Sequence, residues 1–210
     1  MKRTSFLIAA ILIAFLLLSG CTKNLTREEG ILAEVSVAED SSYQATFEEL
    51  NLGVMLDFYL KLPQADSTLV KLSAEGYQNG EKVHEKPLLT ISYGLNQQES
   101  EEGHIGMGII NPSGDNTMLT LFAPGSSSQS DNIAKYIHQD TNLVSTWDDA
   151  LGDTELSLKA GESAILGAYR EAENEIGMHD LQDQQSVETM IESDEIVLLL
   201  KMKVEKQTEK

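Results

Sequence analysis

Apolar and polar residues alternate along several stretches of this chain, and this pattern constrains its fold more than any other feature. Within residues 54–62 every second position is apolar, and Asp57 and Lys61 occupy positions between. Residues 196–204 alternate in the same way with charged side chains. Successive side chains of a strand point to opposite faces, so a period of two predicts strands with one buried face. One solvated face is typical of antiparallel sheets.

Shorter alternating stretches predict further strands, and turn residues separate them. These strands are expected at residues 31–37, 70–74, 89–93, 105–109, 117–122, 156–158 and 163–169. Asn79-Gly80 predicts a hairpin turn, because this pair suits a two-residue connection. Residues 111–116 predict a turn before the next strand, and residues 159–162 predict a second hairpin.

Helix signals are few and short. Residues 131–138 and 186–192 could each form a turn or two. Ser145 with Asp148 resembles a weak capping box, and Gly152 would end that helix. No expected helix is long enough for a crossover between parallel strands. We therefore predict an all-β fold, an antiparallel β-sandwich with a few short helices in the connections.

The N-terminus has the three parts of an export signal. Lys2 and Arg3 give it a positive start, and residues 6–18 follow without a charge. This run is too short to cross a hydrocarbon core, which takes about 20 residues. A basic start, a short apolar run and small residues before a cleavage site are typical of a signal peptide.

The four residues Leu18-Ser19-Gly20-Cys21 closely resemble the lipobox of bacterial lipoproteins. In that family a diacylglyceryl group is attached to the cysteine thiol, and a signal peptidase then cuts before the cysteine. The resemblance implies cleavage between Gly20 and Cys21 and a lipid on Cys21. It also implies a place on the outer face of the cell membrane. The alternatives are an ordinary signal peptide with a chance cysteine, or an uncleaved N-terminal helix.

Composition agrees with the lipid reading. Cys21 is the only cysteine, so no intramolecular disulfide can form. Thr22 stands where aspartate would signal inner-membrane retention in Gram-negative cells. The chain also has a general resemblance to uncharacterised lipoproteins of Gram-positive bacteria. Its expected organisation is a signal peptide at 1–20, a tether at 21–30, one domain at 31–205 and a polar tail at 206–210.

The charge of the chain restricts its partners. The formal net charge is −19, and loss of Lys2 and Arg3 with the signal peptide takes it to −21. Nucleic acids need a basic surface, so this charge argues against them as partners. It permits cationic partners, although a merely solvated surface would have the same composition.

Histidines and acidic groups are the candidate ligands for a metal. His84, His104, His138 and His179 lie in four separate segments, so zinc would need the fold to gather them. His104 alternates with Ile105 and Met107, which places its side chain on the opposite face. His104 with Met107, and Met178 with His179, could form a copper set, but methionine is also ordinary core filler.

The acidic groups are Glu99, Glu101 and Glu102, and the cluster of Asp148, Asp149 and Asp153. The first reads as a solvated loop and the second as a charged helix start. Neither follows the order of an EF-hand calcium loop. No metal or cofactor is therefore predicted.

No catalytic motif was found in the sequence. Gly161-Glu162-Ser163 begins like a hydrolase elbow but lacks its final glycine. Gly103, Gly106 and Gly108 predict a bulge or a close backbone contact in one strand. No residue is therefore predicted to be catalytic.

We expect a non-enzymatic binding or interaction module of the cell envelope, held on the membrane by the lipid, with another envelope protein as its possible partner. The alternatives are an envelope hydrolase with a carboxylate pair, or a solute- or metal-binding lipoprotein. The connections 97–104 and 124–131 are the loops in which binding residues are expected.

Overall fold

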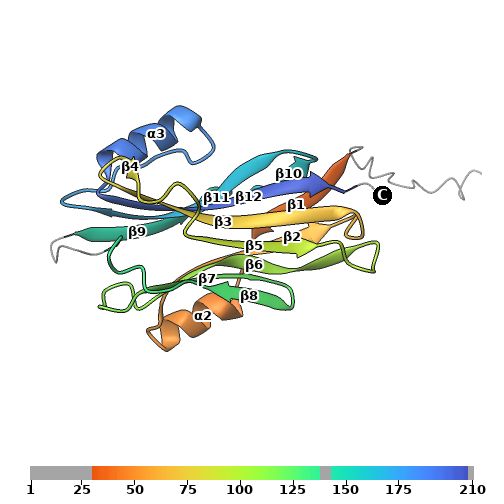
Figure 1. Ribbon diagram of the computed structural model, residues 1–210, viewed down its shortest axis with the longest axis horizontal. Helices are drawn as coiled ribbons and strands as arrows, with labels where there is room; N and C mark the ends of the chain where they lie inside the picture. The colour runs from red at the N-terminus through yellow and green to blue at the C-terminus, as the bar shows by residue number, and fades with distance from the viewer. Residues whose placement is uncertain (1–29, 138–142, 208–210) are drawn as a thin grey trace, which may run out of the picture.

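Two antiparallel sheets pack face to face in the part of the chain that the computed structural model describes, residues 30–137 and 143–207 (Figure 1). The first sheet has the strand order β10-β1-β2-β6-β7-β8, and the second has the order β4-β3-β12-β11-β9, with β5 also paired to β3. The bounds are β1 Ile31–Val37, β2 Gly53–Leu62, β3 Thr68–Gln78, β4 Glu81–Lys82, β5 Leu89–Gly94, β6 Glu101–Ile110, β7 Met118–Ala123, β8 Ser126–Gln129, β9 Val144–Asp149, β10 Leu156–Lys159, β11 Ser163–Ala172 and β12 Ile196–Lys206. The prediction of an all-β antiparallel sandwich is confirmed.

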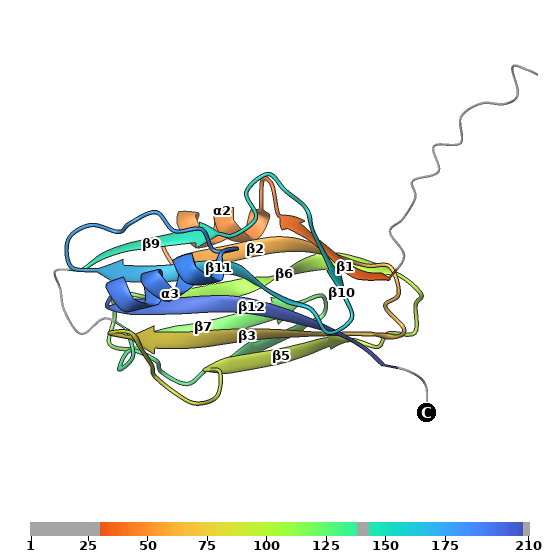
Figure 2. The same cartoon turned by 90° about the horizontal axis from the view of Figure 1, so that it is seen from above.

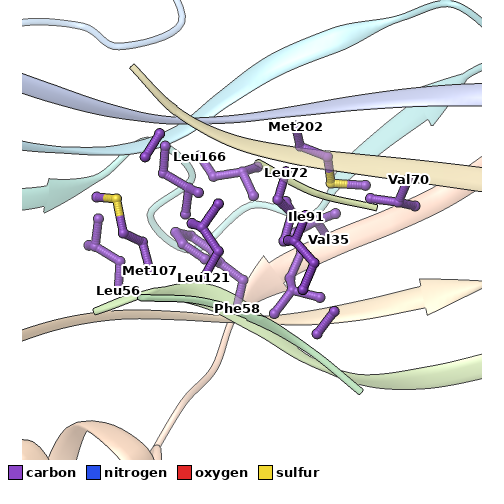
Figure 3. Packing of buried hydrophobic residues seen from close by; sticks show 14 of the residues in the cluster. Val35, Leu56, Phe58, Val70, Leu72, Ile91, Met107, Leu121, Leu166 and Met202 are labelled. Atoms are coloured by element: carbon purple, nitrogen blue, oxygen red, sulfur yellow. The ribbon is translucent and has the colours of Figure 1, made fainter. Parts of the chain in front are cut away.

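The core lies between the two sheets and is built from the alternating apolar residues. Phe58 of β2, Met107 of β6 and Leu121 of β7 point from the first sheet toward Leu72 and Met202 of the second (Figure 3). All five side chains are almost completely buried. Burial of this kind contributes about 25 cal/mol per Å² of apolar surface, so the alternating pattern supplies the main drive for folding.

Two helices cover the outer faces of the sandwich. Helix α3, Gln184–Ser193, lies over the second sheet, and Val187 and Met190 pack there against Val197 and Leu199 of β12. Helix α2, Ser42–Glu49, lies on the outer face of the first sheet, on the opposite side of the molecule (Figure 1). The first sheet therefore has an outer face that α2 covers in part.

Several expected elements differ in the structure. The helix expected at 145–152 is wrong, because residues 144–149 form the strand β9, which pairs with six residues of β11. The hairpin expected across residues 159–162 is also wrong, because β10 pairs with β1 in the first sheet while β11 pairs with β12 in the second. Helix α2 lies between β1 and β2, where no element was expected.

Other expectations about local structure are confirmed. Asn79 and Gly80 form the turn between β3 and β4, and both have positive φ angles of 49° and 82°. Helix α3 covers the helix expected at 186–192. Residues 133–137 form a turn in which the amides of Tyr136 and Ile137 bond to the carbonyl of Ile133.

The direction of β1 places the beginning of the domain at one end of the sandwich. Strand β1 starts beside the end where β12 finishes, and it runs toward α2 (Figure 2). Residues 1–29, with the expected signal peptide, Gly20 and Cys21, lie outside the described residues, as does His138. Within the described residues, no helix combines the length and hydropathy needed to cross a bilayer.

Candidate functional site

Two glycines of β6 let aromatic side chains approach the outer face of the first sheet. A Cβ atom on Gly106 would lie 2.6 Å from the ring of Phe122, and one on Gly108 would lie 3.2 Å from the ring of Phe47 in α2. The pairing of β6 with β2 and β7 continues in register through both positions. The prediction of a close contact at these glycines is confirmed, and the alternative of a bulge is wrong.

A buried carboxylate lies under the N-terminus of α2. Asp57 is 1% exposed, and its Oδ2 atom accepts a hydrogen bond of 2.5 Å from the Ser41 hydroxyl. The same Ser41 oxygen accepts a bond from the amide of Gln44, which caps α2. Asp57 was expected on a solvated face. That expectation is wrong, because α2 covers this part of the sheet.

The Asp57 carboxylate also holds the imidazole of His104. Both of its oxygens lie 3.0–3.1 Å from His104 Nδ1, so the carboxylate accepts the Nδ1 proton. Burial raises the pKa of Asp57 above 3.8, and the bonds from Ser41 and His104 oppose this rise. Since Nδ1 is engaged, Nε2 is the nitrogen through which His104 can meet a ligand.

The order of these three side chains differs from that of a serine hydrolase. In a catalytic triad the imidazole stands between the hydroxyl and the carboxylate and takes the proton from the hydroxyl. Here Asp57 stands in the middle, and the Ser41 proton points to the carboxylate. This arrangement orients an imidazole and does not activate Ser41 as a nucleophile.

Aromatic rings fix the other sides of His104. The rings of Tyr43 and Tyr59 meet the imidazole edge to face, with centroids 5.1 and 5.7 Å away. Tyr43 also meets the ring of Phe122 at 5.7 Å. Such pairs stabilise a fixed orientation by about 0.5–1.5 kcal/mol each beyond simple burial. The His104 side chain is nevertheless 37% exposed, so one edge is open to solvent.

His104 separates two depressions of different character. The first has a volume of about 470 Å³ and is lined mainly by apolar groups, among them Tyr43, Phe47, Met55, Phe122 and Pro124. We call it the apolar groove. It joins the outer face of β7 to α2, and His104 forms part of its wall.

The second depression has a volume of about 580 Å³ and lies on the other side of His104. Carboxylates predominate among its charged groups, which are Glu39, Asp149, Asp153 and Glu155. We call it the acidic depression, and we call the two depressions with His104 between them the His104 face. In Figure 2 the connection from β9 to β10, which supplies part of this wall, rises beside the segment between β1 and α2.

A smaller hollow of about 260 Å³ adjoins the acidic depression and shares Val37 and Asp149 with it. Trp147 of β9 lies at this hollow and is 46% exposed. An aromatic ring beside carboxylates can contact a cation through its face as well as an apolar group. The surface around His104 therefore continues from an apolar groove to an acidic region edged by a tryptophan.

The candidate metal ligands that the structure describes are not gathered into one site. His84 lies between β4 and β5, and His179 lies between β11 and α3. No group of three histidine, cysteine or acidic side chains suited to a metal occurs among the described residues. Asp149 and Asp153 do face one depression, but Asp149 Oδ1 is occupied by the amides of Leu151 and Gly152. Glu101 and Glu102 belong to β6, so the loop expected there is shorter than predicted.

The two expected binding loops meet at the apolar groove, although half of their residues belong to the strands β6 and β8. Gly103 lies against Pro124, where a Cβ atom would be 2.7 Å from the proline ring. The outward direction of His104 is confirmed, because Ile105 and Met107 point into the core.

Sequence reasoning missed Asp57 and Tyr43 as parts of the site. The spacing Ser41-x-x-Gln44 was a signal for the start of α2, since serine followed three residues later by glutamine often begins a helix. Comparisons with protein-family models, curated proteins and solved structures each found no match to this chain.

Proposed function

We propose that this chain is a lipid-anchored, non-enzymatic binding module of the cell envelope, and that it binds another envelope protein through the His104 face. One observation carries the proposal. A buried carboxylate, Asp57, fixes an imidazole at the junction of an apolar groove and an acidic depression. Apolar depressions with a few oriented polar groups are typical of binding sites.

Exposed aromatic groups at this surface support binding to a protein. Tyr43 is 48% exposed although it contacts both His104 and Phe122. Tyrosine and tryptophan are enriched among the residues that dominate the energy of protein interfaces. Aromatic rings whose orientation is already fixed by neighbouring side chains also lose little conformational entropy when a partner binds.

The lipid anchor rests on the resemblance of residues 18–21 to a lipobox. Each buried CH₂ contributes about 0.8 kcal/mol to membrane binding, so several acyl chains on Cys21 hold the domain firmly without a basic patch. This location brings the His104 face within reach of other proteins at the outer surface of the membrane.

Site-specific crosslinking on intact cells tests the proposal. A photoreactive amino acid replaces Tyr43 in one variant and Met178 in a control variant, since Met178 is fully exposed in the connection before α3. We expect a discrete crosslinked protein from position 43 that position 178 does not give. Equal crosslinking at both positions, or none at position 43, would contradict binding through the His104 face.

Hydrolysis of an envelope polymer is the rival activity. If the purified protein released product from such a polymer, and an acid-to-amide change such as Asp149→Asn abolished the release, the chain would be an enzyme. If the purified protein neither cleaves nor binds envelope polymers, this result argues against the hydrolase and favours the proposed binding of a protein.

A further inference from the structure

The two depressions of the His104 face differ in polarity, and together they restrict the chemistry of a bound segment. The apolar groove is formed by rings and side chains that α2 and β7 bring to the outer face of the first sheet. An apolar side chain that enters it would leave water and gain about 25 cal/mol per Å² buried. The groove therefore takes an apolar anchor such as phenylalanine, leucine or methionine.

The acidic depression has the opposite requirement. Of its four carboxylates, Glu155 is bound by Lys61 at 3.3 Å, and this leaves Glu39, Asp149 and Asp153 to set the potential. No lysine or arginine lines this depression among the described residues. A negative ligand would meet like charges there, whereas a positive one gains Coulomb energy and is steered toward the surface.

His104 links the two requirements because it lines both depressions. Its ring is fixed by Asp57 on one side and by Tyr43 and Tyr59 on two others. A ligand that fills both depressions must therefore pass across this ring, with its positive group on one side and its apolar group on the other.

The geometry points to a partner segment that carries a lysine or arginine within a few residues of an apolar residue, with the apolar side chain in the groove and the basic side chain in the acidic depression. This inference rests on the proposed function and names the chemistry of the bound segment. The formal charge of −19, which becomes −21 once Lys2 and Arg3 are lost with the signal peptide, adds long-range attraction for such a segment.

Binding of short peptides to the mature lipidated protein in neutral detergent micelles tests the inference. The probes are labelled, end-blocked glycine-serine peptides with one lysine and one phenylalanine, separated by one to four residues. The matched peptides replace lysine by glutamate or phenylalanine by serine. We expect at least one spacing to bind, both replacements to weaken it at least tenfold, and its affinity to fall as salt is added.

Variants assign each half of the peptide to its depression. Glu39→Gln with Asp153→Asn should weaken the lysine peptide by about 2- to 20-fold, since exposed ion pairs contribute modestly, and leave the glutamate peptide no weaker. Glu188→Gln with Glu192→Gln removes the same charge from α3 and is the control. Tyr43→Ser should reduce the preference for phenylalanine over serine, and Met178→Ser should not.

The outcomes separate this inference from the proposed function. If position 43 crosslinks a protein but lysine and glutamate peptides bind equally, the inference is wrong and the binding function stands. If no peptide binds, the test is the sequence of the partner segment that crosslinks to position 43. A crosslinked segment without a basic residue near an apolar one overturns the inference. Preferred binding of an anionic polymer would overturn it as well.

Discussion

Replacement of Gly106 by alanine tests whether the outer face of the first sheet is as tightly packed as the structure requires. The added Cβ would lie 2.6 Å from the Phe122 ring and would also meet the carbonyl oxygen of Leu56. The ring can turn, but the carbonyl belongs to the neighbouring strand β2, so the two strands must shift. Overpacking of this kind costs about 1–3 kcal/mol.

For a domain of this size, each kcal/mol lowers the melting temperature by about 2–4 °C. We therefore expect Gly106→Ala to lower it by about 2–12 °C, measured by circular dichroism on the purified protein. Gly177→Ala is the control, because a Cβ there would meet only the His179 side chain, at 3.2 Å. Combining Gly106→Ala with Phe122→Leu should cost at least about 0.5 kcal/mol less than the two changes added together. If Gly106→Ala is no more destabilising than Gly177→Ala, the close approach is wrong.

Burial raises the pKa of Asp57, so the folded protein binds the proton of this carboxyl group more tightly than the unfolded chain does. The free energy of unfolding that this proton contributes is therefore lost as pH rises through the folded pKa. The free energy of unfolding, measured by urea titration, should fall less for Asp57→Asn than for the wild type between acid and neutral pH. Curves of this free energy against pH that run parallel for the two proteins would contradict the expectation. Asp194→Ala should cost about 3–5 kcal/mol in the same assay, because Arg170 would remain as a buried charge without its 2.6 Å partner. The double variant Arg170→Met with Asp194→Leu should be closer to the wild type in its free energy of unfolding than Asp194→Ala is. If the double variant loses as much stability as Asp194→Ala or more, the ion pair itself is stabilising. Cys21→Ala should abolish lipid labelling in cells, and labelled lipid on that variant would refute the anchor.

The strands that contribute to the core were predictable, because a period of two in the sequence directly reflects the two faces of a strand. Strand β9 was not, since all of its side chains are exposed or half-buried and no apolar alternation marks it. Helix α2 likewise buries none of its residues completely. The turn at 159–162 was visible, but nothing local shows that the chain passes there from one sheet to the other.

The site was predictable only in part for a similar reason. The outward direction of His104 follows from its neighbours in β6, and this was foreseen. Its partner Asp57 lies 47 residues earlier, and the two meet only because β2 pairs with β6 in the observed register. The burial of Asp57 depends in turn on α2, a helix that the sequence indicates only through its capping residue Ser41 and the glutamine three residues later.

The direction of β1 has a consequence for how far from a bilayer the protein would work. Ser36, near the end of this seven-residue strand, pairs with Tyr59, and Tyr59 pairs with His104. Seven residues of strand span about 23 Å, and the ten residues from Cys21 to Gly30 can span at most about 35 Å. A lipid on Cys21 would thus be attached at the end of the sandwich where β1 begins, about one strand length from the His104 face. Because the tether can span more than the strand, the His104 face would be able to meet partners over a range of heights above the bilayer.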